Sequence, residues 1–136
     1  MRIEGYGNAT DPLHEMTRPL VLVADDDADI LSLVRLRLER SGYAVVSARN
    51  GVEALAIARD RHPALAILDV SMPEMTGIEV TRRLREEHLD VPVILLTARA
   101  RDTDVEAGAD AGADVYVTKP FSPQELESRV RAHVHG

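Results

Sequence analysis

Five polar residues in this chain each stand at or just after the end of an apolar run of strand length: Asp25, Asp26, Asp69, Thr97 and Lys119. If a fold brings the three carboxylates together, they repel one another, and the pKa of at least one of them should rise. A divalent cation relieves that repulsion, and a set of oxygen ligands without His or Cys suits a hard ion. The best fit is Mg²⁺, completed by water and phosphate oxygens, and Mn²⁺ can substitute for it.

Asp69 is the candidate nucleophile of this set. A carboxylate can attack phosphorus and form an aspartyl phosphate. Phosphoryl transfer also needs a metal, a cation and hydroxyl donors around the equatorial oxygens. In this interpretation Asp25 and Asp26 hold the metal, while Lys119 and Thr97 hold the oxygens of the phosphoryl group.

Lys119 is the only lysine among the 16 basic side chains of the chain. Arginine is used everywhere else, so a lysine kept at this one position favours a specific role. A compact ammonium on a flexible stem acts as a point charge toward a phosphoryl oxygen or a carboxylate.

The elements that must position these residues alternate along the chain. Apolar runs predict strands at residues 20–24, 43–47, 64–68, 93–96 and 115–117. Helical spacing and capping signals predict helices at residues 27–41, 51–61, 77–88 and 102–111, with a last helix capped by Ser122. Such alternation indicates a parallel sheet covered by helices on both faces, with all strand carboxyl ends at one edge. The second strand provides only Ser47 as a polar residue at its end, and we therefore expect this strand at the border of the sheet.

Length and composition indicate one domain with a single core, which we place at residues 19–136 after a flexible leader at residues 1–18. The formal charge of −7 disfavours direct binding of nucleic acid by this domain. No stretch predicts a membrane span or a signal peptide, and cysteine is absent, so we expect a cytoplasmic protein.

Four stretches together resemble the receiver domain of two-component response regulators: VLVADDD, LAILDVSMPEMTG, VILLTA and VYVTKPF. They occur in that family's order and spacing, and the resemblance covers about residues 18–134. It implies an α/β, flavodoxin-like (βα)5 three-layer sandwich. The parallel five-stranded sheet would have the order 2-1-3-4-5, with helices on both faces.

The resemblance also implies roles for the acidic residues and their neighbours. Asp69 matches the aspartate that accepts the phosphoryl group. Asp26 matches the direct metal ligand, and Asp25 the ligand that often acts through water. Ser71, two positions after Asp69, would offer its backbone carbonyl to the metal.

A second set of matched residues concerns signalling. Thr97 matches the switch hydroxyl, Tyr116 the aromatic residue that changes rotamer on activation, and Lys119 the lysine that pairs with the phosphoryl group. The bond between Lys119 and Pro120 matches one that is usually cis in the family. The output face implied by the resemblance comprises the helix at residues 102–111, the strand after it and the last helix.

The implied function is a phosphorylation switch rather than an enzyme. A sensor histidine kinase or a phosphotransfer protein would donate the phosphoryl group, and a downstream protein or a missing output domain would read the change. The resemblance also allows a phosphorylation-dependent homodimer. However, Val115 stands where the dimer face of DNA-binding relatives often carries an acid, so the usual charged face is incomplete.

Two other functions compete with this one. A metal-dependent hydrolase that forms an aspartyl phosphate would use similar acids and a lysine. That class carries an acid two residues beyond the nucleophile, where this chain has Ser71, and it needs a substrate-binding cap that these short connections leave no room for. A receiver-like domain that binds partners without phosphorylation is disfavoured because the acids, Thr97 and Lys119 are all present.

Overall fold

The computed structural model describes residues 18–98 and 102–135, so the leader up to residue 17 lies outside the described residues. Five parallel strands form one sheet in the order β2-β1-β3-β4-β5. Their bounds are β1 Leu20–Ala24, β2 Ala44–Ala48, β3 Leu65–Asp69, β4 Val93–Thr97 and β5 Val115–Thr118. This order confirms the predicted topology, with β2 at a border of the sheet.

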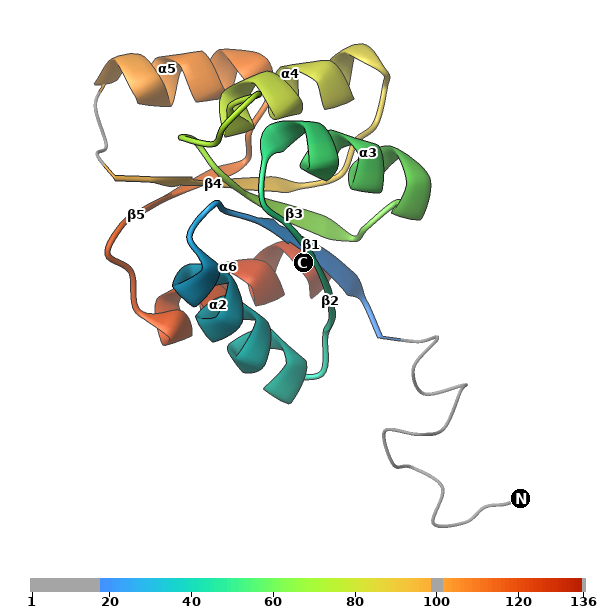
Figure 1. The fold of residues 1–136 in the computed structure, drawn as a ribbon, viewed down its shortest axis with the longest axis vertical. Coiled ribbons are helices and arrows are strands. Elements are labelled where there is room, and N and C mark those ends of the chain that lie inside the picture. The colour runs from blue at the N-terminus through green and yellow to red at the C-terminus, as the bar shows by residue number, and fades with distance from the viewer. Residues whose placement is uncertain (1–17, 99–101, 136) are drawn as a thin grey trace.

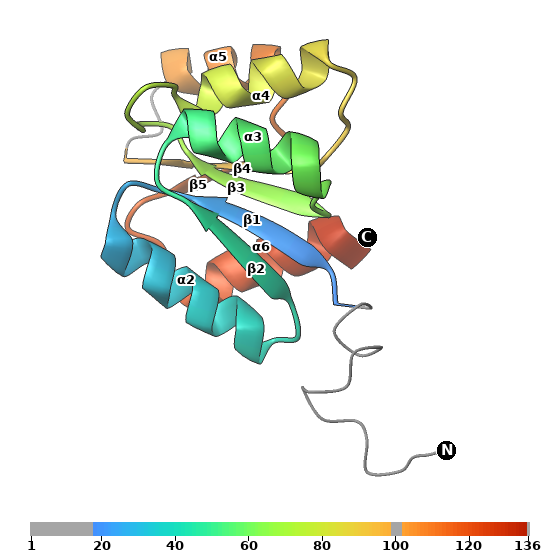
Figure 2. The same ribbon diagram turned by 45° about the vertical axis from the view of Figure 1, so that its right-hand side comes forward.

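Five helices cover the sheet in two layers (Figure 1). Their bounds are α2 Ala28–Arg40, α3 Gly51–Arg61, α4 Gly77–Glu86, α5 Asp102–Ala111 and α6 Pro123–His135. Figure 2 shows α3, α4 and α5 over one face of the sheet, and α2 and α6 over the other. The predicted three-layer sandwich is therefore confirmed.

The central strands have apolar side chains on both faces, as continuous apolar runs predict for a parallel sheet. Every residue of β3 and of β4 is buried. Alternate residues serve the two layers: Val21 and Ile67 pack in the cluster under α2 and α6, and Leu22 and Leu68 in the cluster under α3 and α4. The central strands are thereby held from both sides, which fixes the position of the residues at their ends.

Element boundaries differ slightly from those predicted. The second and third strands begin and end one residue later than expected. The third strand extends to Asp69 because this residue still pairs with Leu96 of β4 in the ladder. The helix expected over residues 77–88 ends at Glu86 because His88 adopts a positive φ of 61°. None of the helices in residues 18–98 and 102–135 is long and apolar enough to cross a membrane.

Candidate functional site

Three predicted carboxylates meet at the carboxyl edge of the sheet. Asp69 is the last residue of β3, and Asp25 follows directly after the adjacent strand β1. The residue Asp25 is 0% exposed and Asp69 is 4% exposed, whereas Asp26 is open to solvent. One carboxylate oxygen from each of the three lies within 4.8 Å of the others. The sheet thus holds two buried acids rigidly beside one exposed acid.

The turn after β1 is held by its own hydrogen bonds. The Asp25 amide donates to the Ala48 carbonyl at 3.1 Å, which ties the turn to β2. The Oδ1 atom of Asp25 accepts from the amide of Asp27 at 2.9 Å. Asp27 in turn caps α2, because its Oδ1 accepts from the amide of Asp29 at 2.9 Å. The third acid of the DDD run therefore has a structural role.

Lys119 supplies the positive charge of the site. Its Nζ lies 2.9 Å from Asp25 Oδ2 and 3.3 Å from Asp69 Oδ2. Its amide donates to the carbonyl of Thr97 at 2.7 Å, and the bond between Lys119 and Pro120 is cis. The backbone after β5 is thus fastened to the end of β4, and the side chain reaches across to the two buried carboxylates.

The electrostatics of the site follow from burial and charge. Burial raises the pKa of Asp69, and the neighbouring Asp25 raises it further, to about 6; Lys119 and the Ser71 amide offset part of this. That amide donates to Asp69 Oδ1 at 3.3 Å. Burial alone would lower the pKa of Lys119, but its pairing with Asp25 and Asp69 outweighs burial and raises it. The ammonium of Lys119 therefore stays charged at neutral pH, while Asp69 loses its proton at a higher pH than an ordinary aspartate.

This donor set fits a hard divalent cation. The three carboxylates offer only oxygen atoms, which Mg²⁺ prefers, and their atoms are close enough together to share one ion. One ammonium balances only one of their charges, so the crevice retains an excess of negative charge. The exposed Asp26 lies on the side from which an ion can enter.

Two glycines missed by the sequence reasoning let the loop between β3 and α4 fold closely around the site. A Cβ at Gly77 would lie 2.4 Å from the Asp69 carbonyl oxygen, and a Cβ at Gly51 would lie 1.9 Å from the carbonyl oxygen of Met75. The loop therefore packs directly against α3 and against the backbone of β3 at Asp69. The sequence identified Gly77 only as a residue typical of a loop. No sequence signal indicated the contact at Gly51.

The two predicted switch residues lie on adjacent strands. Thr97 ends β4 and is 4% exposed, and Tyr116 is half-buried in β5. Tyr116 pairs with Leu95 in the ladder and packs in the cluster on the α3–α4–α5 side. Because side chains alternate along a strand, Thr97 points to the same face as Leu95 and Tyr116. Burial raises the pKa of the Tyr116 phenol, and the charge of Asp110 raises it further.

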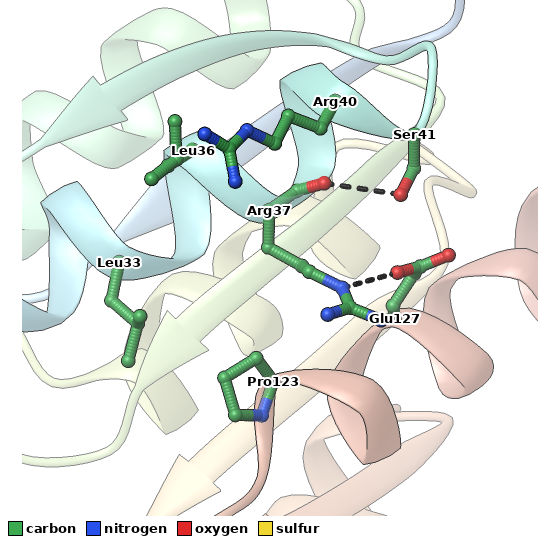
Figure 3. Close-up of a pocket in the computed structure, with 7 residues that line it drawn as sticks. All are labelled: Leu33, Leu36, Arg37, Arg40, Ser41, Pro123 and Glu127. Carbon is green, nitrogen blue, oxygen red and sulfur yellow. Dashed lines mark hydrogen bonds and ion pairs between the residues drawn. The ribbon is translucent and has the colours of Figure 1, made fainter.

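A separate hollow lies between α2 and α6 (Figure 3), and none of the three carboxylates lines it. Its volume is about 380 Å³, and its lining residues are Leu33, Leu36, Arg37, Arg40, Ser41, Pro123 and Glu127. Arg37 Nε donates to Glu127 Oε1 at 2.5 Å across the hollow, and Arg131 also pairs with Glu127. This cluster joins the two helices, and none of the predicted site residues lines it.

Comparison with known proteins places this site in a family context. A family model described as the response regulator receiver domain matches residues 21–131. The chain is 46% identical over 112 residues to the alkaline phosphatase synthesis transcriptional regulatory protein PhoP of Bacillus subtilis (strain 168), a match that covers 82% of this chain and 47% of that protein. It is 41% identical over 119 residues to the phosphate regulon transcriptional regulatory protein PhoB of Pseudomonas aeruginosa, with 86% and 52% covered. The chain thus spans about half the length of these curated relatives.

Solved structures show the same similarity. The Francisella response regulator 1452 receiver domain matches with a TM-score of 0.82 and 35% identity, covering 87% of this chain and 98% of that one. The receiver domain of the sensor histidine kinase PA1611 from Pseudomonas aeruginosa PAO1 matches with a TM-score of 0.81 and 26% identity, covering 88% and 100%. That second structure has a magnesium ion coordinated in its active site cleft.

Proposed function

The chain belongs to the response regulator receiver domain family. We propose that Asp69 accepts a phosphoryl group from a phosphohistidine of a donor protein. The observation that carries this proposal is the geometry around Asp69. Its carboxylate is buried at the end of a rigid strand, lies 3.3 Å from the Lys119 ammonium and shares a crevice with two further acids. A carboxylate fixed in this way needs little reorganisation before it attacks phosphorus.

The transfer balances with water as the proton source. An Asp69 oxygen forms a bond to phosphorus while the bond between phosphorus and the donor imidazole nitrogen breaks. The imidazole leaves with the electron pair and takes up a proton from water. The attacking carboxylate must be ionised, and its pKa of about 6 leaves it mostly ionised at neutral pH.

The remaining residues hold the phosphoryl group. A bound Mg²⁺ would neutralise part of the charge on the phosphoryl oxygens, with Asp25, Asp26, Asp69 and the Ser71 carbonyl as its protein ligands. Lys119 already lies between the two buried acids. We expect its ammonium to turn from Asp69 to a phosphoryl oxygen once the aspartyl phosphate has formed.

The signal follows from the added charge. A phosphoryl group on Asp69 offers new acceptor oxygens close to the end of β4. We expect the Thr97 hydroxyl to move toward it and the Tyr116 ring to turn into the space vacated. The surface formed by α5, β5 and α6 would then change its packing and its affinity for a partner. The product of the reaction is thus a conformation, and the chain is a signalling switch rather than an enzyme with a released product.

The expected partners are assigned from the same proposal. A sensor histidine kinase or a phosphotransfer protein donates the phosphoryl group. The relatives PhoP and PhoB are transcriptional regulators about twice the length covered by this chain, so we propose a downstream protein or an output domain as the reader. We keep residues 1–18 as a leader and residues 19–136 as the receiver domain.

The direct test is the intact mass of the protein after incubation with acetyl phosphate. We expect one phosphoryl adduct that requires Mg²⁺, disappears in chelator and is absent from Asp69→Asn. No adduct on a folded protein that binds Mg²⁺ would refute the proposal and favour a receiver that signals by contact alone. Steady turnover of acetyl phosphate without an adduct would refute it in favour of a hydrolase.

A further inference from the structure

We propose that Gly108 is a positioning residue that holds Tyr116 in its resting position. Gly108 is buried within α5, opposite β5. A Cβ built on it would lie 2.0 Å from the phenol oxygen of Tyr116, 2.7 Å from Cζ and 2.8 Å from Cε1. Carbon atoms that are not bonded do not approach this closely, so the ring occupies a notch that exists only because position 108 has no side chain.

The placement of this glycine supports a role in packing. Glycine inside a helix lowers helix formation about fivefold relative to alanine. Gly108 lies well inside the ten residues of α5, whereas Gly112, after the helix end, has a φ of +102°. The glycine at position 112 is explained by its backbone conformation. The one at position 108 is explained by the ring above it.

The notch gives the proposed switch a defined resting state. The ring of Tyr116 has its hydroxyl end against the backbone of α5, and the face of β5 that carries it is also the face of Thr97. This step rests on the proposed function. Filling the notch removes the position that the ring occupies in this structure and favours the alternative position, which phosphorylation of Asp69 is proposed to select.

The first experiment needs no phosphorylation. We would measure unfolding by urea for the wild type, Gly108→Ala, Tyr116→Ala and the double variant. With the ring removed, Gly108→Ala should raise the ratio of folded to unfolded protein about fivefold, because only helix propensity remains. With the ring present, Gly108→Ala should change the ratio of folded to unfolded protein by a factor at least fivefold smaller than in Tyr116→Ala, because the methyl group overpacks the notch.

A matched control separates packing from propensity. Ala109 is the exposed neighbour of Gly108 in the same helix. Ala109→Gly should lower the ratio of folded to unfolded protein about fivefold whether or not Tyr116 is present. A coupling of less than twofold between positions 108 and 116 would overturn the inference.

The second experiment connects the notch to switching. We would follow the ring signals of Tyr116 by NMR, assigned with Tyr116→Phe, with and without acetyl phosphate and Mg²⁺. In unphosphorylated Gly108→Ala these signals should move toward those of the phosphorylated wild type. If they stay at the resting position, the inference is overturned. If the wild-type protein shows no response to phosphorylation, the proposed switch fails, while the coupling measurement still decides whether Gly108 positions Tyr116.

Discussion

Replacing Asp69 by asparagine should stabilise the metal-free protein at neutral pH. The pKa of Asp69 rises from its ordinary value of 3.8 to about 6, chiefly because the carboxylate is buried and secondly because it faces Asp25. A raised pKa in the folded state means that the ionised form opposes folding, a penalty absent below the unfolded pKa and complete above the folded one. Asparagine keeps the shape of the side chain and removes the charge.

The size of the effect follows from that displacement. A pKa raised from 3.8 to about 6 corresponds to about 3 kcal/mol. Solvent reaches the crevice past the exposed Asp26, and screening reduces the expected gain to about 1–2 kcal/mol. For a domain of this size that is a rise in Tm of roughly 3–8 °C. The extra stability of Asp69→Asn over the wild type should increase as pH rises from about 4 to 6, and it should be constant above that range.

The assay is urea unfolding of wild type and Asp69→Asn in chelator at several pH values between 4 and 8. Asp26→Asn is the matched control, because it removes a charge from the same cluster at a solvent-exposed position and should change stability less. Mg²⁺ should stabilise the wild type more than Asp69→Asn, since an ion held only by the folded acidic cluster favours the folded state. An Asp69→Asn protein that is no more stable than the wild type at pH 7.5, or a gain that does not depend on pH, would refute the reasoning.

Three further substitutions test the supports of the site. Lys119→Met should lower the stability of the metal-free protein by about 2–3 kcal/mol at pH 7, because Asp25 is left buried without its cation; a loss below about 0.5 kcal/mol in urea unfolding would contradict this. Gly51→Ala should cost about 1–3 kcal/mol and weaken Mg²⁺ binding in calorimetry, because its methyl group meets the Met75 carbonyl; unchanged Mg²⁺ affinity would show that the loop adjusts freely. Arg85→Ala should cost about 1–3 kcal/mol and speed amide exchange at the end of α5, because the guanidinium donates to backbone carbonyls beyond both α4 and α5; exchange unchanged there would count against the contact.

The sheet and the acidic cluster could be predicted because strand ends in a parallel sheet share one edge. Asp25 and Asp69 come directly after or at the end of apolar runs, so the order of the runs was enough to bring them together. The exposure of each side chain within the cluster could not be predicted. Asp25 is fully buried while Asp26 is exposed. The turn that places them is tied to β2 by the hydrogen bond from the Asp25 amide to the Ala48 carbonyl, a contact that no local pattern encodes.

Contacts between elements distant in sequence could not be predicted for the same reason. Arg82, Arg83 and Arg85 are indistinguishable by type and spacing in α4, yet only Arg85 is half-buried and bonded to the turn after α5. Likewise, in the sequence Gly108 only lowers the helix propensity of its segment, and its contact with the ring of Tyr116 is seen only in the assembled fold. Such roles follow from which helices the sheet brings side by side, and this is a property of the assembled fold.

The charges of the crevice suit the proposed switch. Two buried carboxylates share one ammonium, at 2.9 Å and 3.3 Å, so the pairing of Lys119 is divided between two acceptors. Arginine would hold one carboxylate in a fixed two-bond geometry, whereas lysine can change partners at little cost. A phosphoryl group on Asp69 would add negative charge to one side of this balance. In the proposed mechanism Lys119 would be drawn to that side. Its amide donates to the carbonyl of Thr97, so this movement would act directly on the end of β4.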